Sequence, residues 1–206
     1  MKNNIKQILL LTLICTLAFS SLIKAQTGYK LTTGTDVAIK VLGSSNVHDW
    51  VMATSAMESQ GNFKFGEGNQ LRELTGFSFS LNAKSLKSEH ESMDNRTYKT
   101  IKADKYPKIA YKLISAVITP IQKNKYLVKT TGDLTIAGVT QTISMNVTAI
   151  VSDENTISCT GSEKLKLTDF KIDPPSFLLG AMKVTNDLTI QFNLLYKSTQ
   201  LITKSN

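Results

Sequence analysis

Apolar and polar residues alternate along most of this chain, and this two-residue period constrains its fold more than any other feature. The segment 77–82 reads Phe-Ser-Phe-Ser-Leu-Asn, and the segment 188–194 reads Leu-Thr-Ile-Gln-Phe-Asn-Leu. The same alternation recurs in segments 37–41, 109–113 and 143–149. Successive side chains of a strand point to opposite faces, so these segments predict strands with one face in a core and the other in water. One-sided strands of this kind are typical of antiparallel sheets.

The expected strands are long and are separated by short turns. Many span on the order of ten residues, or roughly 30 Å at about 3.3 Å per residue. Turn segments containing glycine or asparagine lie at 66–69, 122–124, 137–139 and 152–155. Eight such strands close into an up-and-down barrel that can hold one small ligand, while a two-sheet sandwich, usually built from shorter strands, is the alternative. We therefore predict an all-β, antiparallel, eight-stranded up-and-down barrel with strands at 29–41, 46–59 (continued or followed by 61–65), 71–84, 108–119, 125–137, 141–153, 156–167 and 182–196.

The segment 88–104 departs from this period. Ser88 followed by Glu91 fits a capping box at the start of a helix. The next residues at helical spacing are Met93, Thr97 and Ile101. Because Pro107 ends the pattern, we predict one short amphipathic helix near the barrel mouth. The basic residues of this helix are Arg96, Lys99 and Lys102. We expect them to point away from the barrel and form a solvated face, and the alternative is that they lie near the charged head of a ligand.

The N-terminal segment 1–25 is expected to be a secretory signal peptide. It has a basic start, an apolar core at 8–19 that is too short to span a membrane, and Ala25 as a suitable small residue at the cleavage site. The mature protein is then expected to be periplasmic or secreted. It would comprise one barrel domain at 26–198 and a flexible tail at 199–206.

The net charge and the cysteine content limit the kinds of partner that we expect for this protein. The formal charge of +8 includes Lys2, Lys6 and Lys24 of the expected signal peptide, which leaves +5 on the mature chain. The basic residues are scattered without an arginine cluster, so we expect no nucleic-acid binding, although mild attraction to anionic membrane surfaces is compatible with this charge.

Cys159 is the single cysteine of the mature chain, so no intramolecular disulfide can form, and its strand-like setting favours a buried, inert thiol. We expect no stable membrane insertion, and the oligomeric state stays open, a homodimer included.

The segment His48-Asp49-Trp50 is the cluster that most resembles an enzyme site. Neighbours on a strand point to opposite faces, so His48 and Asp49 cannot orient each other, and Trp50 is expected to fill the barrel end or line its interior. No metal-ligand spacing joins His90 to His48, and the chain lacks hydrolase, phosphate-loop and zinc-protease motifs. We predict no enzyme activity, no cofactor and no metal, with an enzyme using His48 as the last-ranked alternative.

Four stretches resemble the YceI-like family of exported, polyisoprenoid-binding proteins. They appear in the family's order at 45–50, at 93–94 leading to 105–109, at 132–140, and at 167–175 followed by 183–184. The third is the most specific, because a strand, a glycine turn and a restarting strand are fixed at one spacing. The resemblance implies a lipocalin-like barrel around a tubular apolar cavity that takes an isoprenoid chain, such as a quinone or a polyprenyl phosphate, for carriage or storage. The Gly-x-Trp signature of true lipocalins is absent near the N-terminus.

The inward-facing side chains are the candidate ligand-binding residues under this resemblance. They are mostly aromatic: Trp50, Phe63, Phe77, Phe79, Tyr111, Met145, Phe170, Ile190 and Phe192. An apolar tube built from them suits an isoprenoid or another long-chain lipid, since each buried CH₂ group contributes roughly 0.8 kcal/mol. The alternative is that they fill the barrel, in which case the protein is a periplasmic interaction or stress-response protein without a ligand.

Overall fold

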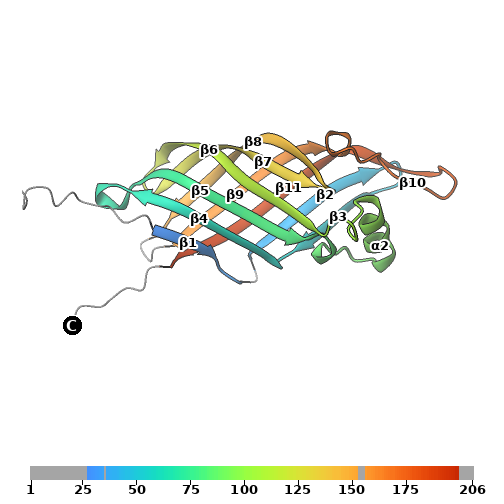
Figure 1. Cartoon of the computed structure of the whole chain (residues 1–206), viewed down its shortest axis with the longest axis horizontal. Helices are drawn as coiled ribbons and strands as arrows, with labels where there is room; N and C mark the ends of the chain where they lie inside the picture. Colours follow the sequence, from blue (N-terminus) through green and yellow to red (C-terminus); the bar gives the residue numbers. More distant parts are fainter. Residues whose placement is uncertain (1–26, 35, 153–155, 200–206) are drawn as a thin grey trace, which may run out of the picture.

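The expected eight-stranded barrel is confirmed. The computed structural model of the chain describes residues 27–34, 36–152 and 156–199. The expected signal peptide, residues 153–155 of an expected turn and nearly all of the expected tail lie outside this part. Strands adjacent in the barrel are antiparallel, and β1 pairs with β11 to close the ring (Figure 1). The eight barrel strands are β1 (Thr27–Leu31), β4 (Met57–Phe65), β5 (Leu71–Asn82), β6 (Lys108–Gln122), β7 (Lys125–Ile136), β8 (Val139–Val151), β9 (Thr156–Lys166) and β11 (Met182–Ser198).

The expected strand at 29–41 is wrong as a single element. The chain leaves the barrel after Leu31 and re-enters it as β2 (Ala38–Ser45), because the sequence Thr-Thr-Gly at 32–34 breaks the alternation and Val37 N–H closes a turn onto Gly34 O at 3.2 Å. Both pieces pair with β11: β2 pairs with its residues 184–193, and β1 pairs with its residues 196–198. The two pieces therefore act as one interrupted strand.

The expected strand at 46–59 is interrupted in the same way. It begins later than predicted, because Ser45 and His48 form a turn with a Ser45 N–H to His48 O bond of 3.0 Å. The chain then runs through β3 (Asp49–Thr54), breaks at 55–56 and continues as β4. The β3 strand pairs with β2, and one bridge joins Ala53 to Lys87. The β2–β3 hairpin therefore extends the wall beyond the β1–β4 pair.

Tight turns join β6 to β7 and β7 to β8, as the sequence predicts. The β7–β8 turn places Ala137 and Gly138 at φ of 51° and 77°, a left-handed pair that matches the twist of a two-residue hairpin. Asn124 adopts the same region between β6 and β7. The other short elements are η1 (Glu67–Asn69), η2 (Ala83–Ser85), η3 (Leu167–Phe170) and β10 (Ser176–Phe177), which pairs with β11.

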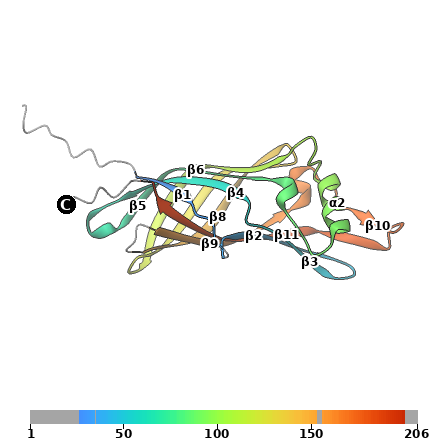
Figure 2. The same cartoon turned by 90° about the horizontal axis from the view of Figure 1, so that it is seen from below.

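The helix α2 (Glu91–Thr100) lies across one barrel end, opposite the start of β1 and the end of β11 (Figures 1 and 2). It is the only α-helix in the described ranges, and no helix there is long and apolar enough to cross a bilayer. The expected capping box is wrong, because His90 is the N-cap residue and makes no side-chain cap bond. Instead, the carboxylate of Asp94 accepts from Ser88 N–H at 2.7 Å and from Ser88 Oγ at 2.8 Å.

These contacts fix the helix to the segment after β5. Burial alone would raise the pKa of Asp94, but the hydrogen bonds from Ser88 and the ammonium of Lys87, 3.4 Å away, lower it below the ordinary carboxyl value. The Tyr98 hydroxyl adds bonds to Leu86 O at 2.7 Å and Lys84 O at 2.9 Å. The helix is thus held at one edge by a buried carboxylate and a tyrosine.

The barrel interior is filled at the end where β1 begins and β11 ends. We call the aromatic cluster there the plug, and its rings contact one another at centroid distances of 5.2 to 6.3 Å. Its members are Tyr29, Phe63, Phe65, Phe77 and Tyr196. Tyr196 is fully buried, and its hydroxyl contacts Ser59 Oγ at 2.8 Å. Edge-to-face and tilted packing of this kind stabilises a core beyond simple area burial.

Candidate ligand-binding cavity

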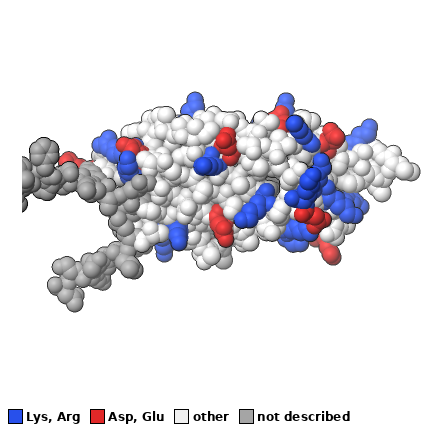
Figure 3. Space-filling model, in the orientation of Figure 1, with Lys and Arg blue, Asp and Glu red and all other residues white. Residues whose placement is uncertain are grey.

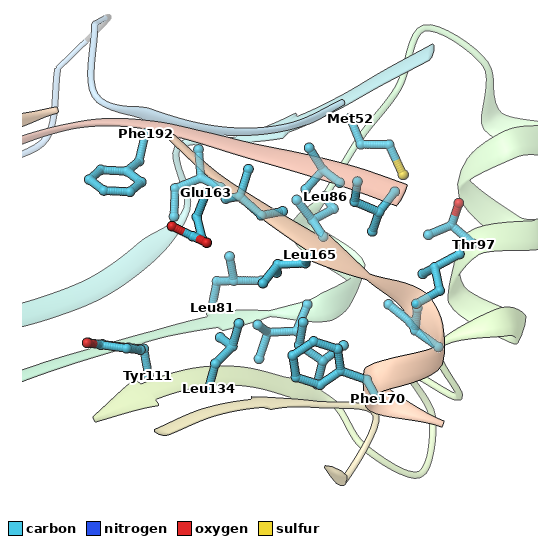
Figure 4. Close-up of a pocket in the computed structure, with 18 of the residues that line it drawn as sticks. Met52, Leu81, Leu86, Thr97, Tyr111, Leu134, Glu163, Leu165, Phe170 and Phe192 are labelled. Carbon is cyan, nitrogen blue, oxygen red and sulfur yellow. The ribbon is translucent and has the colours of Figure 1, made fainter. Parts of the chain in front are cut away.

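An apolar cavity occupies the barrel from the plug to the helix α2 (Figure 4). Its volume is about 380 Å³, which lies within the range of small-molecule sites. Its wall draws side chains from every barrel strand except β1, and also from β2, β3 and α2. Alternation explains this wall, because every second residue of each strand points inward.

The nine residues predicted from the sequence all lie on the cavity wall. Phe63 and Phe77 form its floor, where the cavity meets the plug. Phe170 comes from η3 at the other end and is 2 % exposed. The barrel is therefore filled at the plug and hollow between the plug and α2. That these residues contact a ligand stays a prediction.

Three of the aromatic rings lie against glycines of neighbouring strands. Trp50 covers Gly43, Tyr111 covers Gly132 and Phe192 covers Gly161, and a Cβ atom on any of these glycines would overlap the ring. Gly43 and Gly161 are the direct cross-strand partners of Trp50 and Phe192. Glycine permits this close approach, so the rings lie along the wall and the bore stays open.

Glu163 is the feature of the cavity that the sequence reasoning missed. It is the only acidic side chain among the residues that line the cavity, and Figure 4 shows its carboxylate pointing inward among aliphatic side chains. None of the ion pairs between described residues includes it. Burial raises the pKa of Glu163 above the ordinary carboxyl value. The sequence does indicate this orientation, because Glu163 is separated by an even number of positions from Cys159 and Leu165, which also line the cavity from β9.

Polar and basic side chains surround the cavity mouth. His48 comes from the β2–β3 turn, His90 and Arg96 from α2 and its N-cap, and Lys166 from the end of β9. Arg96 is exposed, as expected of a solvated helix face, but its guanidinium also lies 4.9 Å from the centre of the Phe177 ring and lines the mouth. A cation over an aromatic face is a favourable contact. The mouth therefore combines positive charge with an apolar passage.

The His48-Asp49-Trp50 segment shows no assembled catalytic group. His48 Nδ1 lies 2.9 Å from the backbone oxygen of Asp49 rather than from its carboxylate. Trp50 lines the cavity, and its buried Nε1 has no hydrogen-bond partner in the described part of the chain. Within the same ranges, no three His, Cys, Asp or Glu side chains are grouped to hold a metal ion.

Comparison with solved structures places the barrel in a known fold. Burkholderia cenocepacia BcnA is 21% identical with a TM-score of 0.57, and the match covers 76% of this chain and 95% of that one. A polyisoprenoid binding domain from Saccharophagus degradans is 11% identical with a TM-score of 0.60, covering 82% and 98%. The Campylobacter jejuni YCEI protein is 20% identical with a TM-score of 0.52, covering 69% and 82%. At these identities the likeness shows the fold alone.

The sequence comparisons identify the family. No curated protein sequence matches the chain. The model of the YceI-like domain matches residues 32–196, which is nearly all of the barrel and includes the four stretches on which the resemblance was based. The chain therefore belongs to the YceI-like family.

Proposed function

We propose that this protein binds one long isoprenoid, or a similarly long lipid, inside the barrel and carries or stores it. The observation that carries this proposal is the cavity itself: an apolar tube of about 380 Å³ that ends blindly on the plug. Burial of alkyl chain there is favourable by roughly 0.8 kcal/mol per CH₂. A barrel filled along its whole length, the alternative considered from the sequence, would leave no such space.

The polarity of the two ends supports an orientation for the ligand. The rings of Phe63 and Phe77 form the floor, whereas Arg96, Lys166 and two histidines surround the mouth. A lipid therefore enters tail first and leaves its head at the mouth, where a polyprenyl phosphate or a quinone finds positive charge and hydrogen-bond donors. The Saccharophagus degradans domain with the same fold is described as polyisoprenoid binding, which supports the same ligand class here.

The proposal includes export and excludes catalysis. The segment 1–25 has the pattern of a signal peptide, which supports a periplasmic or secreted protein. Among the described residues, none of the ion pairs includes Glu163, and His48 contacts a backbone oxygen, so neither side chain is paired as a nucleophile with a base there. We therefore assign the inward residues to binding.

Native mass spectrometry combined with organic extraction tests the proposal. The protein would be purified from the envelope of its own bacterium without added lipid. We expect a co-purifying polyprenyl or quinone species at near one-to-one stoichiometry. A delipidated sample would then be titrated with undecaprenyl phosphate and with menaquinone. Protein that carries no lipid from the envelope and binds neither probe would refute the proposal.

A further inference from the structure

The hairpin between β10 and β11 presents two leucines to solvent at the mouth end. Leu178 is 69 % exposed and Leu179 is fully exposed. Both adopt left-handed φ angles, 54° and 55°, in a turn closed by Gly180 N–H to Phe177 O at 3.1 Å. Leucine is disfavoured in this region, and neither side chain gains burial in compensation. The fold alone therefore gives no reason for leucine at either position.

A second turn places another exposed apolar residue beside this tip. Val47, in the β2–β3 turn, is 61 % exposed. Asn46 joins the two turns, because its Nδ2 donates to Ala181 O at 2.9 Å and its Oδ1 accepts from Lys183 N–H at 2.7 Å. The β2–β3 turn is thus hydrogen-bonded to the base of the β10–β11 hairpin, which projects beyond the barrel (Figure 1). We call Val47, Leu178 and Leu179 the apolar tip.

The apolar tip continues into the cavity mouth. Phe177 precedes Leu178, and Met182 lies at the start of β11, directly opposite Phe177 in the hairpin. Both side chains line the cavity, and Arg96 of α2 lies over the Phe177 ring. A lipid tail leaving the cavity therefore meets apolar surface from the mouth to the tip.

The same end of the molecule carries excess positive charge. The segment 84–108 contains seven basic and four acidic residues. Two of the acidic residues are in ion pairs, Asp94 with Lys87 and Asp104 with Lys84. Figure 3 shows Lys and Arg side chains gathered over the region of α2, behind the uncharged projection of the hairpin. An apolar tip backed by basic residues complements an anionic bilayer, whose headgroups attract cations and whose acyl boundary accepts apolar side chains.

We propose that the mouth end docks on an anionic phospholipid bilayer, with the apolar tip in the acyl boundary and the basic residues of the α2 region at the headgroups. Docking places the cavity mouth at the membrane, so that a lipid passes between bilayer and barrel along Phe177 and Met182 without crossing water. The inference rests on the proposed function for its purpose, but docking can be measured without any ligand.

The decisive variant replaces both tip leucines with asparagine, L178N and L179N together. Asparagine is well tolerated at positive φ, so the thermal midpoint of the variant should equal or exceed that of the unchanged protein. The matched control is I121N, because Ile121 is 53 % exposed on β6 at the opposite end of the barrel. Binding is measured by co-sedimentation of the mature chain with vesicles of phosphatidylglycerol and phosphatidylethanolamine, and with vesicles of phosphatidylcholine alone.

We expect the unchanged protein and I121N to bind the anionic vesicles in a salt-sensitive manner and to bind phosphatidylcholine weakly. The double variant should lose at least about tenfold in partition coefficient. Menaquinone uptake from vesicles should slow with it, whereas uptake from a dilute ethanol dispersion should not change. Absence of binding to protein-free anionic vesicles, or an equal loss in I121N, would overturn docking. Failure of uptake from the dispersion would instead count against the proposed function.

Discussion

Substitution of Ile190 by tryptophan tests whether the cavity is the binding site. Ile190 lines the cavity from β11, where its cross-strand neighbours are Val41 and Glu163. Tryptophan adds about six non-hydrogen atoms to the bore and so displaces roughly one five-carbon isoprene unit. At ~0.8 kcal/mol for each buried carbon, the loss is about 4 kcal/mol, or roughly a thousandfold in Kd.

Stability separates this outcome from simple damage to the fold. The cavity of about 380 Å³ has room for the indole, so we expect the free energy of unfolding to change by less than about 1 kcal/mol, whereas overpacking of a filled core costs ~1–3 kcal/mol. Binding is followed by gel filtration of protein loaded with menaquinone and by its absorbance. The control is Gln191→Trp on the exposed outer face of the same strand. Unchanged affinity in the Ile190 variant, or an equal loss in the Gln191 variant, would refute the reasoning.

Three further outcomes follow from buried groups. Because burial raises the pKa of Glu163, the stability that this side chain contributes is present below the ordinary carboxyl pKa and is lost as the pH rises through the raised value. The variant Glu163→Gln should therefore be more stable than the unchanged protein at neutral pH. The difference between their thermal midpoints should close toward about pH 4. The pKa of Asp94 is lowered, so its effect on stability has the opposite pH dependence. Asp94→Ala should lower the free energy of unfolding in urea by about 1–3 kcal/mol at neutral pH. This difference should shrink in acid as the carboxylate of the unchanged protein is protonated. Burial raises the pKa of Cys159 to about 12, so in the mature chain a disulfide reagent such as DTNB should label this thiol at pH 8 only after denaturant unfolds the barrel, and rapid labelling of folded protein would contradict its burial.

The strand pattern could be predicted from the sequence because one period governs it. Alternation fixes which residues face inward, and turn residues such as Asn124 and Gly138 mark where strands end. The interruptions after Leu31 and Thr54 were missed, because they bend strands whose alternation resumes a few residues later. Bends of this kind depend on pairing with β11 and with the β2–β3 hairpin, and these contacts are distant in sequence.

The wall of the cavity was easier to predict than its extent. Parity accounts for the predicted wall residues that lie on strands, but not for Phe170 of η3, and it could not separate Phe63, which forms the floor, from Phe79, which lines the open part. That division depends on how rings from four strands pack together. The contact between Arg96 and Phe177 could not be predicted for a similar reason, since the two residues lie far apart along the chain.

The rings that lie flat on Gly43, Gly132 and Gly161 have a consequence for ligand selectivity. The hydrogen bonds between strands set the circumference of the barrel. Each glycine, by contrast, sets how far the side chain that covers it extends into the cavity at that position along the barrel axis. Alanine at Gly43 or Gly161 would push a single ring inward and create a local constriction, with these hydrogen bonds left intact, whereas at Gly132 its Cβ would also meet the backbone oxygen of Lys112 on the neighbouring strand. Selectivity between slender and branched chains can therefore evolve by single substitutions, independently of strand number and register.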